Sequence, residues 1–125
     1  MKTVVSTEKA PAALGPYSQA NIVGNLVFTS GMVPINPVDG SIPSDVKEQA
    51  EQSLNNIKAV LEAAGSSMDK VFKTTVFIKN MDDFGKINEV YATFFNGDFP
   101  SRSCVEVARL PKDVLVEMEA IATLD

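Results

Sequence analysis

Residues 100–122, PSRSCVEVARLPKDVLVEMEAIA, contain two segments whose side-chain character alternates residue by residue. Neighbouring side chains on a β-strand point to opposite faces of the sheet, so this alternation predicts two strands, which a short turn would join into a hairpin. Directly opposed residues share a face, and the hairpin therefore sets Arg102 roughly opposite Glu119. Cys104 would lie roughly opposite Glu117. We expect a guanidinium and carboxylates on one sheet face beside a thiol.

Two interpretations of this charged face remain open. The face is either a solvated surface of an exposed strand pair or a binding site for a small anion. The register also remains open, because a slip of one residue moves every side chain to the other face.

The composition predicts a single domain covering residues 1–125, large enough to form a core without metals or disulfides. A net charge of −5 argues against nucleic-acid binding, which relies on clustered Lys and Arg. The chain has no apolar stretch near the roughly 20 residues needed to span a membrane. Its first residues contain no long apolar region, so we do not expect them to form a signal peptide. A single cysteine cannot form an internal disulfide, which is typical of a cytoplasmic protein.

The chain contains no histidine. This excludes a Ser-His-Asp triad, a Cys-His pair and a histidine metal ligand. A lone cysteine without a neighbouring base is more often inert than nucleophilic, so the thiol of Cys104 has no expected role. Any chemistry must use carboxylates, arginine, tyrosine, hydroxyls, backbone groups and water.

The order of elements follows from the same patterns. We expect strands at residues 3–6, 17–23, 26–31 and 71–79, in addition to the terminal pair. A first helix is expected over residues 46–64, with Asp45 and Glu48 as a capping box and Gly65 as its stop. A second helix should start after Asn80 and end at residues 96–97.

This β-β-β-α-β-α-β-β order predicts an α+β fold, with a six-stranded mixed sheet and two helices on one face. The other face also carries apolar strand residues, which need cover. We therefore expect self-association.

Several stretches of the chain resemble the signature motifs of the Rid proteins, the reactive intermediate deaminases also called the YjgF family. The likeness is closest to the archetypal enamine/imine deaminase branch and covers essentially the whole chain in the right order. The motifs are GPYSQ at 15–19, TSG at 29–31, NEVY at 88–91, PSRSCVEV at 100–107, ARLPKD at 108–113 and EMEAIA at 117–122.

The resemblance implies a fold similar to chorismate mutase, assembled as a homotrimer with clefts at the subunit interfaces. It also implies hydrolysis of 2-aminoacrylate and 2-aminocrotonate, or their imine tautomers 2-iminopropanoate and 2-iminobutanoate, which PLP-dependent serine and threonine dehydratases release. The products would be a 2-oxo acid and ammonia, without a cofactor or metal. The expected setting is amino-acid metabolism, including isoleucine biosynthesis.

The resemblance also assigns roles to residues at the matching positions. Arg102 would bind the substrate carboxylate, for which its planar fork is suited. Glu117 and the backbone carbonyl of Cys104 would orient the attacking water, and Glu117 would also relay protons.

Four further positions are expected at the cleft. Tyr17 would donate a phenol hydrogen bond to substrate or water, whereas Ser30 and Gly31 would offer a hydroxyl and close backbone approach. Asn88 would reach the cleft from the second helix. For each, a purely structural role remains open.

The chain departs from the family pattern at two places, the short loop 96–99 and Met32, where a polar Gln is expected. Both departures leave the rim of the cleft and the preferred substrate open. Two other functions compete with catalysis: a regulator that binds 2-oxo acids in the same cleft, and RNA cleavage, against which the acidic charge counts.

Overall fold

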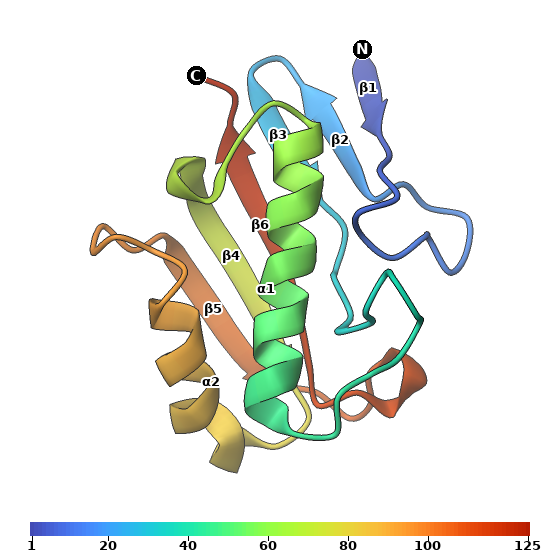
Figure 1. Ribbon diagram of the computed structural model, residues 1–125. Helices are drawn as coiled ribbons and strands as arrows, with labels where there is room; N and C mark the ends of the chain where they lie inside the picture. The colour runs from blue at the N-terminus through green and yellow to red at the C-terminus, as the bar shows by residue number, and fades with distance from the viewer.

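The computed structural model describes residues 1–125, and its element order confirms the β-β-β-α-β-α-β-β prediction. Three short 3-10 turns, at Met68–Lys70, Met81–Asp83 and Pro111–Asp113, connect these elements. The strands and helices are β1 Lys2–Val5, β2 Ala20–Val23, β3 Leu26–Thr29, α1 Val46–Ala63, β4 Val71–Ile78, α2 Phe84–Ala92, β5 Ser101–Glu106 and β6 Val116–Thr123 (Figure 1).

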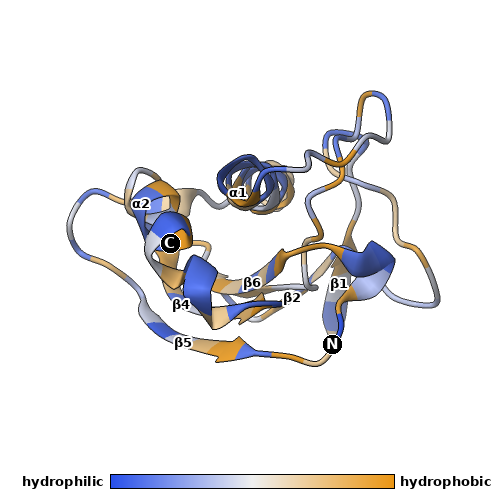
Figure 2. Ribbon diagram, turned by 90° about the horizontal axis from the view of Figure 1, so that it is seen from below, coloured by the Kyte–Doolittle hydropathy of each residue, from blue (hydrophilic) through white to orange (hydrophobic).

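The six strands form one sheet in the order β1-β2-β3-β6-β4-β5. Strands β4 and β5 are parallel, and all other neighbours are antiparallel. Both helices lie on the same side of this sheet, as Figure 2 shows from below. The predicted α+β fold, with a six-stranded mixed sheet and two helices on one face, is therefore confirmed.

The predicted terminal hairpin is wrong. Strand β4 lies between β5 and β6, so the two segments that alternate in residues 100–122 do not pair with each other (Figure 1). Thr74 on β4 aligns with Arg102 on one side and Ala120 on the other, which places Arg102 in line with Ala120 rather than Glu119. Similarly, Cys104 aligns through Val76 with Met118 instead of Glu117.

The connection between β5 and β6 explains this arrangement. It is a loop whose Leu110 and Val114 are buried in a small apolar cluster with Val33 and Ile35, away from the main core. The loop is thus long enough, and sufficiently anchored, to carry the chain past β4. Since α2 connects β4 to β5, these two strands have the helical crossover that parallel neighbours require.

Helix α1 begins and ends where its sequence signals predict. The Asp45 carboxylate accepts a hydrogen bond from the Glu48 backbone N–H at 3.1 Å, which caps the first turn. Gly65 follows the helix with φ of +89°, a conformation that stops a helix readily. One face of α1 is fully buried against the sheet and includes Ala50, Leu54, Ile57 and Leu61.

Helix α2 starts as predicted but ends early. The Asn80 side chain accepts a hydrogen bond from the Asp82 backbone N–H at 2.9 Å and begins the 3-10 turn that leads into the helix. At the other end, the Thr93 hydroxyl donates to the Val90 carbonyl at 2.6 Å. This local bond competes with helix continuation, so α2 ends at Ala92 rather than near residue 96.

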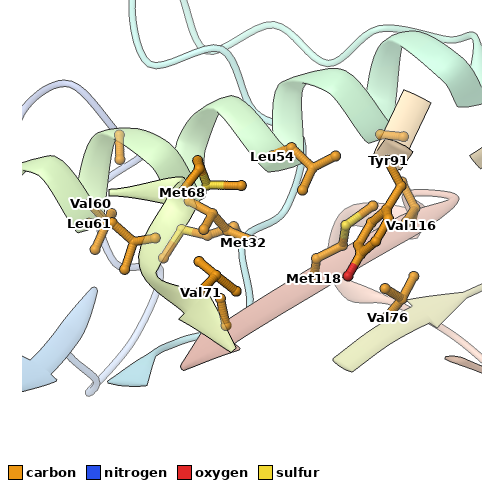
Figure 3. Packing of buried hydrophobic residues seen from close by; sticks show 14 of the residues in the cluster. Met32, Leu54, Val60, Leu61, Met68, Val71, Val76, Tyr91, Val116 and Met118 are labelled. Carbon is orange, nitrogen blue, oxygen red and sulfur yellow. The ribbon is translucent and has the colours of Figure 1, made fainter. Parts of the chain in front are cut away.

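The main core lies between the sheet and the helices and contains 21 buried residues, several of which are seen in Figure 3. Met32 is one of them, with only 4% of its surface exposed. Its carbonyl accepts a hydrogen bond from the Ser53 hydroxyl at 2.7 Å. The Met32 side chain, where the family pattern has a Gln, therefore packs in the core, and Met32 also lines the small crevice that contains Tyr17 and Gly31.

No helix covers the opposite sheet face, although Phe77 on this face packs against the small cluster that contains Leu110 and Val114. Its register places Val4, Phe28 and Val105 on this face, and all three are exposed. Glu117 lies on the same face. Neither helix combines the length and hydropathy needed to cross a bilayer.

Candidate active site

The first part of the site surrounds Arg102 on the edge strand β5, on the helix-covered side of the sheet. The Arg102 guanidinium donates a hydrogen bond to Asn88 Oδ1 at 2.8 Å. It also lies over two aromatic rings, 4.8 Å from the Tyr91 centroid and 5.4 Å from the Phe84 centroid. The predicted pairing of Arg102 with Glu119 is absent, so no carboxylate neutralises the guanidinium within the chain.

A cavity of about 430 Å³ opens beside this guanidinium. Its lining combines the arginine and an amide with apolar surface, from Asn88, Tyr91, Ala92, Phe99, Pro100 and Arg102. Phe99 belongs to the short 96–99 loop, which therefore forms part of the wall. A small acid with a short apolar side chain matches this mixture of one cation and apolar surface.

Cys104 lies two residues beyond Arg102 and on the same face of β5. Burial raises the pKa of its thiol, and the nearby positive charge of Arg102 only partly opposes this effect. The thiol is therefore protonated near neutral pH and is a poor nucleophile. This agrees with an expected role for the backbone of Cys104 instead of its sulfur.

We expect Cys104→Ser to retain the imine hydrolysis that the family resemblance implies, within about 3-fold of the original rate, because a neutral thiol contributes little to such a reaction. The measurement is the rate of 2-oxo acid formation by the purified variant. An inactive variant with an unchanged thermal midpoint would instead assign the chemistry to the sulfur.

The second part of the site surrounds Glu117 on β6, on the open face of the sheet. Burial raises the pKa of the Glu117 carboxyl, and the negative charge of Glu119 raises it further. A carboxyl group with a raised pKa exchanges protons more readily near neutral pH, as general acid–base catalysis requires.

Gly31 leaves the space that the Glu117 carboxylate occupies. A Cβ atom at position 31 would lie 2.5 Å from Oε1 and 2.7 Å from Cδ of Glu117. Both distances are shorter than van der Waals contact, so any larger residue at position 31 must displace the carboxylate. The predicted close approach at Gly31 is thus directed at a protein side chain.

Gly31→Ala tests this contact. We expect the variant to fold, because the carboxylate is the flexible end of a side chain. We also expect the rate to fall by about 100-fold, since a displacement near 1 Å at a reacting group has effects of this size. The measurements are the hydrolysis rate and the thermal midpoint; an unchanged rate would show that the position of Glu117 is unimportant.

The hydroxyls of Tyr17 and Ser30 both form hydrogen bonds with the loop that precedes β2. The Tyr17 hydroxyl accepts a hydrogen bond from the Leu14 backbone N–H at 3.0 Å, and its ring shares a small crevice with Gly31. The Ser30 hydroxyl donates to the Ser18 carbonyl at 2.6 Å. Within one chain, both hydroxyls therefore hold the loop, while the Tyr17 proton and the Ser30 lone pairs stay available.

Gln19 anchors the loop itself, a role that the sequence motif does not reveal. Its side chain accepts a hydrogen bond from the Thr7 N–H at 2.7 Å and donates to the Pro11 carbonyl at 2.8 Å. Gln19 is buried, so these bonds fix the path of the chain on either side of Tyr17.

The two parts of the site lie on opposite faces of the sheet. Arg102 and Cys104 share a face with the buried residues Thr74 and Val76, whereas Glu117 aligns with Phe77 and lies on the open face. The expectation that Arg102, Cys104 and Glu117 share one face is therefore wrong. It depended on the hairpin, which β4 interrupts. No cluster of three or more His, Cys, Asp or Glu side chains is present that could hold a metal ion.

The fold and the site define a class: α+β proteins with two helices on one face of a six-stranded sheet and a cavity that an arginine lines. The sequence profile described as Endoribonuclease L-PSP matches residues 7–124. The chain thus belongs to the YjgF/Rid family, to which this profile corresponds.

Individual relatives agree with this membership. The chain is 54% identical over 125 residues to the 2-iminobutanoate/2-iminopropanoate deaminase of Escherichia coli, covering 98% of each chain. It is 55% identical to a RutC family protein of Haemophilus influenzae, covering 98% of this chain and 97% of the relative.

Solved structures resemble this chain in both fold and sequence. The YjgF gene product of Escherichia coli superposes with a TM-score of 0.95 at 52% identity, covering 98% of this chain and 99% of that one. Escherichia coli TdcF with bound serine gives a TM-score of 0.93 at 50% identity, covering 97% and 98%.

Proposed function

We propose that this protein hydrolyses short 2-imino acids, namely 2-iminobutanoate and 2-iminopropanoate, to the 2-oxo acid and ammonia. The observation that carries the proposal is the Arg102 guanidinium, which Asn88 holds at the cavity with no carboxylate neutralising it. The name of the Escherichia coli relative, identical at 54% of positions, supports the same reaction. The lone cysteine favours a cytoplasmic location.

Arg102 would bind the carboxylate that all these substrates carry. Its remaining N–H donors match a carboxylate in a bidentate geometry, and its charge persists at physiological pH. The apolar part of the cavity wall would accept the methyl or ethyl group of the substrate. Binding would therefore place C2, the carbon of the C=N bond, at a fixed distance from the guanidinium.

Glu117 would then act on the attacking water. The substrate would react as the protonated imine: the carboxylate accepts a proton as the water oxygen bonds to C2 and the C=N π pair moves to nitrogen, which gives a neutral carbinolamine. The same proton is then delivered to the nitrogen, and the C–N bond breaks with its electron pair going to nitrogen. Ammonia leaves as the C=O forms, and the carbinolamine hydroxyl releases its proton to the carboxylate. One group with a raised pKa serves both transfers. The Cys104 carbonyl would orient the water, and Tyr17, Ser30 and Gly31 would line the same space.

This mechanism requires a second copy of the chain, because Arg102 and Glu117 lie on opposite faces of one sheet. We propose a homotrimer whose clefts each combine the arginine face of one copy with the open face of the next. The exposed apolar residues Val4, Phe28 and Val105 of the open face support such an assembly, since contact would remove them from water. A cyclic, head-to-tail interface brings two different surfaces together at every contact.

A coupled assay with threonine dehydratase tests the proposed function. The dehydratase releases 2-aminocrotonate, and formation of 2-oxobutanoate is followed with and without this protein. Semicarbazide traps the free imine and reports competition for it. We expect faster 2-oxobutanoate formation and less trapped imine; no acceleration by a folded oligomer would contradict the proposal.

A further inference from the structure

A buried pair of hydroxyls lies beneath Arg102, and the proposed reaction does not use it. Tyr91 of α2 is 5% exposed and Thr74 of β4 is 2% exposed. Their hydroxyl oxygens are 2.6 Å apart, so each satisfies the other inside the core. Figure 3 shows the Tyr91 ring extending from the helix toward the sheet, with its oxygen at the far end.

Arg102 is the cross-strand neighbour of this pair. Thr74 pairs with Arg102 between the parallel strands β4 and β5, so both side chains leave the same face. The Arg102 side chain passes over the Tyr91 ring, and its guanidinium carbon lies 4.8 Å from the ring centroid. The ring thus lies between the core and the guanidinium.

Helix α2 supplies all the side chains that are seen to contact the guanidinium within the chain. Phe84, Asn88 and Tyr91 are spaced four and three residues apart, which places them along one helix face. Asn88 accepts a hydrogen bond from the guanidinium, and the two rings lie against it. A long arginine side chain at an edge strand would otherwise sample many rotamers.

We propose that Tyr91 is a positioning residue, whose ring orients the Arg102 guanidinium, while Thr74 satisfies its buried hydroxyl. This inference rests on the proposed function, because it assumes that Arg102 binds a substrate carboxylate. Stacking covers one side of the planar guanidinium and leaves its edge donors free for the ligand.

The electrostatics of the pair agree with this role. Burial raises the pKa of the Tyr91 phenol, although the Thr74 hydrogen bond and the charge of Arg102 act in the opposite direction. The phenol therefore stays neutral across the physiological range. A phenolate would instead form an ion pair with Arg102 and compete with the substrate carboxylate.

The test measures the dissociation constant of 2-oxobutanoate, the stable product, by calorimetry. We expect Tyr91→Leu to weaken binding by about 10-fold, the scale of a partly desolvated cation–π contact. Phe95→Leu is the matched control: the Phe95 ring packs against the Tyr91 ring in a tilted arrangement, with 4.9 Å between their centroids, and Phe95 is not one of the two rings that lie against the guanidinium. It should lower the thermal midpoint and leave the dissociation constant unchanged.

Two further variants separate the ring from the hydroxyl and protect against a folding failure. Tyr91→Phe keeps the ring and should bind within about 3-fold of the original protein. Phe84→Leu removes the exposed ring and should weaken binding by about 3-fold even where Tyr91→Leu does not fold. Unchanged affinity in Tyr91→Leu, or in Phe84→Leu if the former is unfolded, would overturn the proposal, as would equal losses in Tyr91→Phe and Tyr91→Leu.

The outcome for the unaltered protein distinguishes the two proposals. If it neither binds 2-oxobutanoate nor accelerates imine hydrolysis, the proposed function itself fails. If it does both and Tyr91→Leu binds equally well, only the positioning role fails.

Discussion

Arg102→Ala is expected to slow imine hydrolysis by about 30- to 1000-fold, which corresponds to roughly 2–4 kcal/mol for a charge-assisted bidentate pair. The substitution removes the only group in the cavity that carries a positive charge. The fold should survive, because Arg102 is half-exposed and its one hydrogen bond is to the Asn88 side chain. We therefore expect an oligomer of unchanged size and an almost inactive enzyme.

The measurement compares kcat/KM of the variant with that of the original protein in the dehydratase-coupled assay. Lys86→Ala removes a positive charge from an exposed position of α2 and serves as the charge control. Arg102→Lys keeps the charge but loses the planar fork, so its kcat/KM should lie between that of Arg102→Ala and that of the original protein. Full activity of a folded Arg102→Ala oligomer would show that the carboxylate binds elsewhere.

Glu117→Gln is expected to reduce kcat by about 100-fold or more, the usual contribution of a positioned general base. Glutamine keeps the shape of the side chain beside Gly31 but can no longer take up a proton. Substrate affinity should change little, since in the proposed cleft the substrate carboxylate would contact Arg102 of a different copy of the chain. A decrease confined to KM would contradict the assigned role.

The pH profile gives an independent test of Glu117. Its folded-state pKa is raised above the ordinary value of a glutamate, with burial as the main cause and Glu119 as the second. Since the proposed mechanism requires the ionised carboxylate, kcat should fall as the pH drops through this raised pKa, which lies above the ordinary value of a glutamate. Glu117→Gln should abolish this acid limb, and Glu119→Gln should shift its midpoint to lower pH.

The same shift has a defined consequence for stability. A raised folded-state pKa means that the native chain binds more protons than the unfolded chain between the two values. The contribution of Glu117 to the free energy of unfolding therefore decreases as the pH rises from the unfolded pKa through the folded pKa. Glu117→Gln should remove this slope, which denaturation at several pH values can measure.

Local signals in the sequence were sufficient for the elements of the fold. The Asp45 cap, the apolar stripe of α1 and Gly65 define a helix that differs from its predicted range by one residue. Which strands pair with each other was harder to predict, because alternation of side-chain character shows that a strand exists but does not identify its neighbour. The strand–helix–strand order from Val71 to Glu106 does contain a usable signal, since such a crossover is typical of parallel neighbours.

In the candidate site, too, the sequence identifies individual residues but does not show how they are arranged in space. Arg102, Asn88 and Gly31 were all identified from the family motifs, and their contacts in the chain are specific. Their distribution over the two sheet faces depends on the register through β4, which the motifs do not contain. The contacts of Arg102 with the two aromatic rings of α2 were also not predicted, although the spacing of Phe84, Asn88 and Tyr91 on one helix face is visible in the sequence.

Subunit mixing tests most directly whether the active site is built from two copies. Arg102→Ala and Glu117→Gln chains, each nearly inactive alone, would be unfolded together in equal amounts and refolded into mixed oligomers. In a randomly mixed cyclic trimer, about a quarter of the clefts join an intact arginine face to an intact glutamate face. We predict recovery of about a quarter of the original activity; mixtures no more active than the separate variants would contradict an intersubunit site.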